Sequence, residues 1–272
     1  MRAVILIDNL SNNPDLTPEW GLAIYIEFEG RKYLLDTGAS EIFAQNAEAL
    51  GIDLSQVDFG ILSHAHHDHS DGMDTFFEKN TKADFWLRHP TKENCYGSKE
   101  MEVIDYIGIK KGILETYKDR IQFAEGKVEL APNVYLLGHS TPDLSYYGQL
   151  YRMFLKIGDQ YQYDDFRHEQ SLIFDTDKGL VVFNSCCHAG ADTILMEAME
   201  AFPGKKVHAI IGGFHLFESP AHAVREFGQR LQDTGVERVV TGHCTGLDAY
   251  DILKDMLGDK AQQMECGLTI EF

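Results

Sequence analysis

The feature that most constrains this chain is the segment 64–69, HAHHDH, in which three histidines and an aspartate follow the spacing H-x-H-x-D-H. Imidazole and carboxylate groups are the ligands that zinc and iron take in proteins. The apolar run before it, residues 57–62, predicts a short buried strand, so the histidines are expected in the loop at its carboxyl end. Such sheet edges are where α/β proteins hold their ligands. A metal site is therefore the first function that the sequence predicts.

A histidine-rich surface loop or a tag-like run is the alternative interpretation of this segment. A tag would be uniform and terminal, whereas Asp68 interrupts the run and Asp71-Gly72 follows it as a turn. His67 occupies a variable position of the spacing. We expect His67 to face solvent or to hydrogen-bond to a ligand rather than to bind metal.

Composition limits the class of protein. The chain has 272 residues, of which 44% are hydrophobic, so it is long enough for a real core, and we expect a single domain spanning residues 1–272. The net charge of −19 argues against non-specific binding to nucleic acid or to anionic membranes, which leaves a small molecule as the expected partner. No stretch approaches the roughly 20 apolar residues of a membrane span, and no targeting segment is visible. Five cysteines without a C-x-x-C pair favour a cytoplasmic location. The sequence leaves the oligomeric state open.

Short strands and helices follow one another along most of the chain, in two similar halves. This pattern predicts an α/β fold with four layers, an αββα sandwich. Two segments depart from it. Residues 92–118 are predicted as an inserted, partly helical segment, and residues 142–167, rich in tyrosine and phenylalanine, as a loop that either covers a cleft or packs on the core.

Three later strand ends supply further metal-binding residue types. Cys186 and His188 follow the predicted strand 180–184, His215 follows 207–211, and His243 follows 238–240. Glycines beside them allow close approach of the backbone. Because the segment 64–69 alone cannot complete a site for two metals, we expect these residues to converge on it.

The order of these motifs resembles the metallo-β-lactamase superfamily. Asp36-Thr37-Gly38 matches its first motif, residues 64–69 its defining second motif, and His243 its last metal-binding histidine. A finer resemblance, to the dihydropteroate synthase-like branch linked to methanopterin biosynthesis, is carried by EQSL at 169–172, GLVV at 179–182, CCHAG at 186–190, GGFHL at 212–216 and HCTG at 243–246.

The resemblance implies two metal sites. The first metal would be bound by His64 and His66, and the second by Asp68, His69 and His243. Two divalent ions are expected, zinc in first place, with iron or manganese as alternatives.

Further ligands are implied near the strand 180–184. Most relatives have an aspartate where this chain has Cys186, which is either a metal ligand or a small buried hydrophobe. The third ligand of the first site is expected to be His188, with His139 and His168 as alternatives. Asp36 is expected to orient a ligand histidine rather than to bind metal itself.

These features imply a binuclear metal-dependent hydrolase that uses a metal-bound hydroxide on a small ester or phosphorylated substrate. Asp68 would also accept a hydrogen bond from the attacking water, and His215 would protonate a leaving group or hold a substrate oxyanion. Packing in the core is the alternative role of His215. The alternative functions are a metal-dependent transferase that joins a dihydropterin to a ribofuranosylaminobenzene phosphate, as the branch resemblance implies, and a non-catalytic metal-binding protein.

Overall fold

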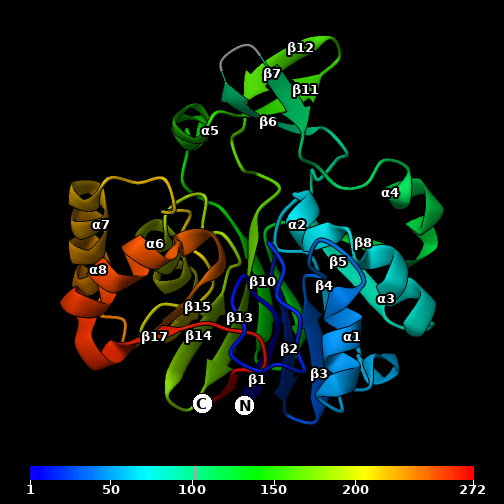
Figure 1. The fold of residues 1–272 in the computed structure, drawn as a ribbon, viewed down its shortest axis with the longest axis horizontal. Coiled ribbons are helices and arrows are strands. Elements are labelled where there is room, and N and C mark those ends of the chain that lie inside the picture. The colour runs from blue at the N-terminus through cyan, green and yellow to red at the C-terminus, as the bar shows by residue number, and fades with distance from the viewer. Residues whose placement is uncertain (101–102) are drawn as a thin grey trace.

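The fold is described from a computed structural model, which covers residues 1–100 and 103–272. Two mixed seven-stranded sheets lie face to face within these ranges (Figure 1). The first sheet has the strand order β18 (Thr269–Glu271), β1 (Arg2–Ile7), β2 (Ala23–Phe28), β3 (Arg31–Leu35), β4 (Phe59–Ile61), β5 (Asp84–Arg88) and β8 (Ile121–Ala124). The second has the order β17 (Ala261–Gln263), β16 (Arg238–Thr241), β15 (Val207–Ile211), β14 (Gly179–Phe183), β13 (Gln170–Thr176), β10 (Val134–Gly138) and β9 (Lys127–Ala131).

Helices cover the outer face of each sheet. The first sheet carries α1 (Ile42–Ala49), α3 (Met73–Lys79) and α4 (Ile113–Thr116), and the second carries α6 (Ala191–Ala201), α7 (Ala221–Asp233) and α8 (Leu247–Leu257). One buried apolar cluster fills the space between the sheets, and two others lie under the helices. The chain therefore has the predicted four-layer αββα architecture. No helix in the described ranges is long and apolar enough to cross a membrane.

The two segments predicted as partly helical and as a loop contain strands as well as short helices. Residues 92–118 form β6 (Cys95–Glu100) and β7 (Val103–Tyr106) before α4, and residues 142–167 form α5 (Ser145–Tyr151), β11 (Met153–Ile157) and β12 (Gln160–Tyr163). These strands pair in the order β12-β11-β6-β7, so two segments distant in sequence build one small sheet. Figure 1 shows this sheet above the sandwich, at the end away from both termini.

Parallel pairing brings the chemically interesting loops to one end of the molecule. β3 pairs with β4, and β14, β15 and β16 pair in sequence, all in parallel, so their carboxyl ends point the same way. The loops after β3, β4, β14, β15 and β16 carry Asp36, residues 64–69, Cys186 with His188, His215 and His243. This is the end that lies beneath the small sheet (Figure 1).

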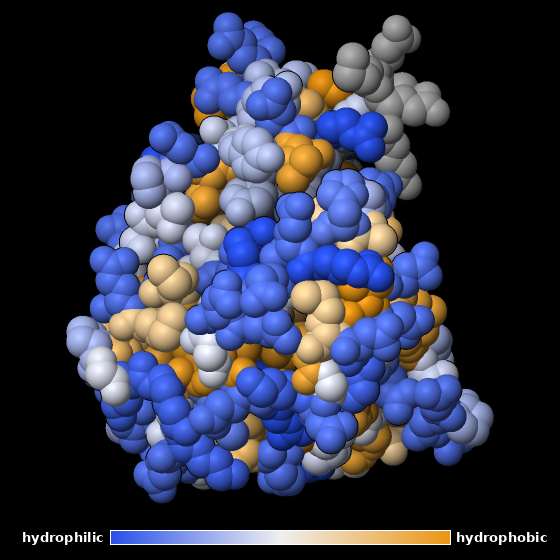
Figure 2. Space-filling model, turned by 90° about the vertical axis from the view of Figure 1, so that its left-hand side faces the viewer, coloured by the Kyte–Doolittle hydropathy of each residue, from blue (hydrophilic) through white to orange (hydrophobic). Residues whose placement is uncertain are grey.

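Figure 2 shows that hydrophilic side chains cover most of one face of the molecule, with hydrophobic residues visible between them. This surface agrees with the strongly acidic composition.

Candidate metal centre

Three histidines from two loops form the first group of the site. Ligand atoms of His64, His66 and His188 all lie within 4.8 Å of one another. The ring centroids of His64 and His66 are 4.6 Å apart, and those of His64 and His188 are 4.9 Å apart. The side chains are buried, with 0%, 4% and 1% of their residue surface exposed. The structure thus brings His188, rather than either alternative, to the first group.

The second group lies beside the first. Ligand atoms of Asp68, His69 and His243 also lie within 4.8 Å of one another, with Asp68 Oδ2 at 3.4 Å from His243 Nε2 and 3.7 Å from His69 Nε2. Cys186 Sγ is 3.2 Å from His69 Nε2 and also falls within 4.8 Å of a ring nitrogen of His64. Cys186 therefore lies between the two groups, and all seven predicted ligands converge.

Hydrogen bonds orient two of these rings. His69 Nδ1 lies 2.8 Å from Asp36 Oδ2, and a carboxylate only accepts, so Nδ1 carries the proton. Ser63 donates its hydroxyl proton to the same Asp36 oxygen at 2.7 Å and accepts from His64 Nδ1 at 2.8 Å. In both histidines the lone pair is left on Nε2, which faces the site. Asp36 therefore orients the candidate ligand His69 directly, and His64 through Ser63.

Asn9 fixes the third ring and was not predicted. Its Nδ2 donates to the carbonyl of His243 at 3.1 Å, so its Oδ1 is the acceptor for His243 Nδ1 at 3.1 Å. The buried Asp8 carboxylate accepts from the backbone N–H of His243 at 2.8 Å. Asparagine in a loop after a strand predicts only a turn, and no local signal ties Asn9 to a histidine far along the chain.

His188 is held by packing instead. Its ring stacks on Phe166 with centroids 4.6 Å apart and an interplanar angle of 4°, and it lies 4.5 Å from the ring of His215. Its backbone N–H donates to Glu169 Oε1 at 3.0 Å. Neither ring nitrogen of His188 has a hydrogen-bond partner in the described part of the chain.

The residues present fit divalent metal ions. Five buried ring nitrogens at the site have no hydrogen-bond partner among residues 1–100 and 103–272. They are Nε2 of His64, His66 and His243 and both ring nitrogens of His188. Buried polar atoms almost always have a hydrogen-bond partner, so several unpaired nitrogens that converge on one place indicate a binding site for a cation. Burial lowers the pKa of His66 to about 3, which keeps its ring in the neutral form that binds metal.

The pKa of Asp68 is also lowered, which for a carboxyl group favours the charged form. Burial raises it, but the adjacent His69 and His243 outweigh burial and hold the pKa well below its usual value. Asp68 is therefore a carboxylate, the form that binds a cation.

The two alternative ligands are engaged elsewhere. His139 lies between two carboxylates, with Nε2 at 2.7 Å from Glu169 and Nδ1 at 2.8 Å from Glu197, so it has no free nitrogen for a metal. His168 Nδ1 accepts from the backbone N–H of Ala65 at 3.1 Å. Because hydrogen bonds use both nitrogens of His139 and of His168, the geometry favours His188 as the third member of the first group.

A further buried group surrounds His168, because ligand atoms of His66, Cys95, Asp164 and His168 lie within 4.8 Å of one another. The tautomer argues against a third metal there. Since His168 Nδ1 accepts a hydrogen bond, its proton is on Nε2, which lies 3.0 Å from Asp164 Oδ2 and donates to it. This pair therefore supports the backbone of the loop 64–69.

His215 and Cys244 complete the surroundings. His215 is half-buried beside His188 and Tyr151, whose ring centroid is 4.3 Å away, and its Nδ1 lacks a hydrogen-bond partner among the described residues. Cys244 follows His243 directly, and its Sγ lies within 4.8 Å of Cys186 Sγ and a ring nitrogen of His243. Sequence analysis did not select Cys244, although the HCTG motif contains it.

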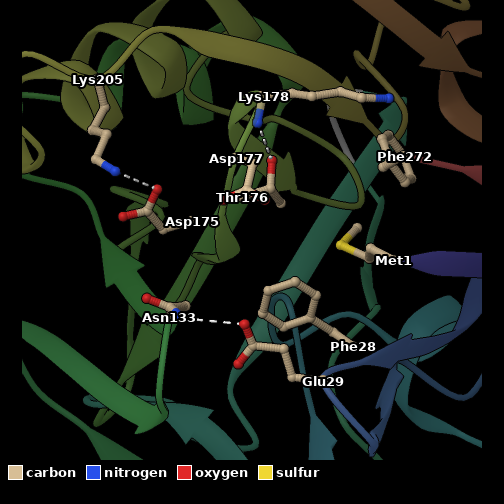
Figure 3. Close-up of a pocket in the computed structure, with 10 residues that line it drawn as sticks. All are labelled: Met1, Phe28, Glu29, Asn133, Asp175, Thr176, Asp177, Lys178, Lys205 and Phe272. Atoms are coloured by element: carbon tan, nitrogen blue, oxygen red, sulfur yellow. Dashed lines mark hydrogen bonds and ion pairs between the residues drawn. The ribbon is translucent and has the colours of Figure 1, made fainter.

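A large cavity elsewhere in the molecule has no histidine or cysteine in its lining. It has a volume of about 340 Å³ and lies beside both chain termini, at the opposite end of the molecule (Figures 1 and 3). Figure 3 shows Lys205 directed at Asp175 and Asn133 at Glu29.

Comparisons with known proteins agree with this arrangement. The sequence model of the metallo-beta-lactamase superfamily matches residues 17–140. A curated relative from Methanocaldococcus jannaschii, 7,8-dihydropterin-6-methyl-4-(beta-D-ribofuranosyl)-aminobenzene-5'-phosphate synthase, is 26% identical over 94% of this chain and 92% of its own length.

Among solved structures, a metal-dependent hydrolase of the beta-lactamase superfamily has a TM-score of 0.83 and 29% identity, and the match covers 100% of this chain and 99% of that chain. Zn²⁺-bound PqqB from Methylobacterium extorquens has a TM-score of 0.58 and 14% identity, with full coverage of both chains, and shares the fold.

The αββα sandwich, with histidines and an aspartate gathered at the loops of one end, defines a metal-dependent hydrolase fold. The chain is similar to the metallo-beta-lactamase superfamily in the sequence of residues 17–140 and in its fold.

Proposed function

We propose that this protein is a hydrolase with two divalent metal ions that acts on a small ester or phosphorylated substrate. The first ion would be held by His64, His66 and His188, and the second by Asp68, His69 and His243, with Cys186 between them. The observation that carries the proposal is the convergence of buried ring nitrogens that have no hydrogen-bond partner in the described residues. The likeness to a metal-dependent hydrolase over the whole chain supports it.

Bound ions would supply Lewis acidity toward a carbonyl or phosphoryl oxygen and would lower the pKa of water. The side chains of the protein position the reactants. Asp68 is the most exposed of the seven, with 13% of its side chain accessible, so its carboxylate can accept a hydrogen bond from an incoming water. His215 lies beside the first group with Nδ1 unpaired among the described residues, where it can donate a proton to a leaving group.

We propose zinc as the resident metal, because a cysteine among histidines is a borderline-soft set of ligands. All five cysteines are buried and unpaired, which supports a reducing compartment, the cytoplasm. We also propose that residues 1–272 form one domain.

Elemental analysis of the purified protein tests the metal assignment. We expect His66→Ala to lose one of two bound ions, since His66 belongs to the first group only. His67→Ala is the matched control, because His67 is adjacent but exposed and should leave the metal content unchanged. Equal metal content in wild type and His66→Ala would contradict the assignment.

A second function remains supported by the 26% identity to the methanopterin synthase over 94% of the chain. This alternative is a transferase that joins a dihydropterin to a ribofuranosylaminobenzene phosphate. Turnover of simple esters or phosphodiesters without a pterin would favour the hydrolase. Strict dependence on a pterin diphosphate would favour the transferase.

A further inference from the structure

We propose that the substrate carries a flat aromatic ring, which binds against Trp20 and Phe217 at the exposed side of the metal centre. The inference rests on the proposed function for the location of the reaction, and it adds the chemical class of the group next to the scissile bond. Nothing in the sequence pattern had assigned a role to either residue.

Trp20 lies at an exposed side of the site, next to Asp68. The candidate histidines and Cys186 are at most 4% exposed, whereas 13% of the Asp68 side chain is accessible. The indole N–H of Trp20 donates to Asp68 Oδ2 at 3.0 Å, and the indole ring lies 5.2 Å from the ring of His243. A molecule that reaches Asp68 from solvent therefore contacts Trp20.

The two rings leave much apolar surface open to water. Trp20 is 46% exposed and Phe217 is 44% exposed, although both are large apolar side chains. Their centroids are 5.4 Å apart and their planes meet at 73°, so together they present the face of one ring beside the edge of the other. This corner between Trp20 and Phe217 suits a flat ring. Such a ring can stack on one of the two side chains and make an edge-to-face contact with the other.

Both rings are fixed before any ligand binds. The hydrogen bond to Asp68 holds Trp20, and the ring of Phe217 packs against the rings of Trp20 and His215, with centroids 5.4 Å and 5.3 Å away. Less side-chain entropy is then lost on binding, which favours a specific contact.

The corner also lies between the two groups to which we assign proton chemistry. On one side Trp20 contacts Asp68, and on the other the ring of Phe217 is 5.3 Å from that of His215. An aromatic ring bound in the corner keeps an attached ester or phosphate within reach of both side chains.

A matched pair of ligands tests the proposal. Phenyl phosphate and cyclohexyl phosphate have the same charge and a six-membered ring, but only the first ring is flat and aromatic. We expect calorimetric titration of the metal-loaded protein to show phenyl phosphate binding about three- to tenfold more tightly, as aromatic stacking predicts. Equal affinities, or no binding of phenyl phosphate, would overturn the proposal.

Variants separate the ring from the hydrogen bond. Trp20→Phe and Trp20→Leu both lose the N–H to Asp68, but only Trp20→Phe keeps a ring. The preference for phenyl phosphate should survive in Trp20→Phe and disappear in Trp20→Leu, with equal metal content in the two proteins. A preference that persists in Trp20→Leu would assign the aromatic contact elsewhere.

Phe217→Leu should also abolish the preference. Phe123→Leu is its control, because Phe123 is 46% exposed on β8, outside the site. If wild type showed no preference and formed dimers that Phe217→Leu dissociates, the rings would belong to an interface and the proposal would fall. A protein that binds phenyl phosphate more tightly than cyclohexyl phosphate but hydrolyses neither it nor other esters would refute the hydrolase and leave this inference standing.

Discussion

At the scale of single residues, the ligand histidines are oriented by side chains from distant parts of the chain. Asp36 and Ser63 direct Nε2 of His69 and His64 into the site, and Asn9 does the same for His243. A metal-bound imidazole gains affinity when its other nitrogen donates to a fixed acceptor, because the ring needs no reorientation on binding. Asn9 therefore belongs to the metal centre although it would not contact the metal.

Asn9→Ala should weaken the second metal site and spare the first. The variant removes the acceptor for His243 Nδ1 and the donor to the His243 carbonyl. We expect about a 10- to 100-fold loss of affinity for the second ion, measured by competition with a chromophoric chelator. Asn12→Ala is the control, since the exposed Asn12 side chain hydrogen-bonds to Glu265, away from His243. Equal weakening of both ions would indicate a general loss of structure instead.

The outcome for these residues shows which parts of the site a sequence reveals. The spacing within 64–69 and the position of His188 in its motif were sufficient to place them together, and the structure agrees. Asn9 could not be found, because it is separated from His243 by 234 residues and asparagine in a loop usually indicates a turn. His139 and His168 were plausible by position, and only the carboxylates and N–H groups around them exclude them.

At the scale of secondary-structure elements, a buried ionic network ties β10, α6 and the loop before β13 to the site. His139, at the end of β10, contacts both Glu197 of α6 and Glu169, which in turn accepts from the backbone of His188. Burial by itself lowers the pKa of His139, but hydrogen bonds to the two carboxylates outweigh it and raise the pKa to about 9. The network is therefore ionised at neutral pH.

This network predicts a loss of stability in mild base. A histidine with a raised pKa contributes stability that is fully present below its unfolded value, near 6.5, and is lost as pH rises through about 9. Urea unfolding of wild type should show a fall of at most about 3 kcal/mol between these limits. His139→Gln should be less stable at pH 6.5 and should show a smaller fall, because His243, whose pKa is also raised to about 9, keeps its own contribution. An unchanged slope in the variant would assign the effect to other groups.

The small sheet above the site shows why some elements escape prediction. Every residue of β12 is exposed, and β11 is half-buried along most of its length, so neither strand has the alternation of apolar and polar residues that predicts a sheet. Its partner, β6, lies in the other segment, and pairing such as Leu155 with Cys95 is set by tertiary structure. In the sandwich, where strands have buried faces, the predicted strands 57–62, 180–184, 207–211 and 238–240 correspond to β4, β14, β15 and β16.

At the scale of the whole molecule, the fold buries several neutral histidines at the end that carries the candidate metal centre. Burial and the neighbouring His215 hold the pKa of His188 well below its usual value, and burial and His69 do the same for His64. His66 is lowered to about 3. In the unfolded chain each ring takes up a proton near pH 6.5, so the metal-free protein should lose stability as pH falls from 6.5 toward 3.

His66→Gln isolates one of these protons. In chelator-treated protein the free energy of unfolding should fall between pH 6.5 and 5 in wild type, and the slope in the variant should be smaller by up to about 1.4 kcal/mol per pH unit. Asp8 acts in the opposite direction, because burial raises its pKa to about 6, but it is present in both proteins and cancels in the difference. Identical slopes in the two proteins would mean that His66 is already solvated in the folded state.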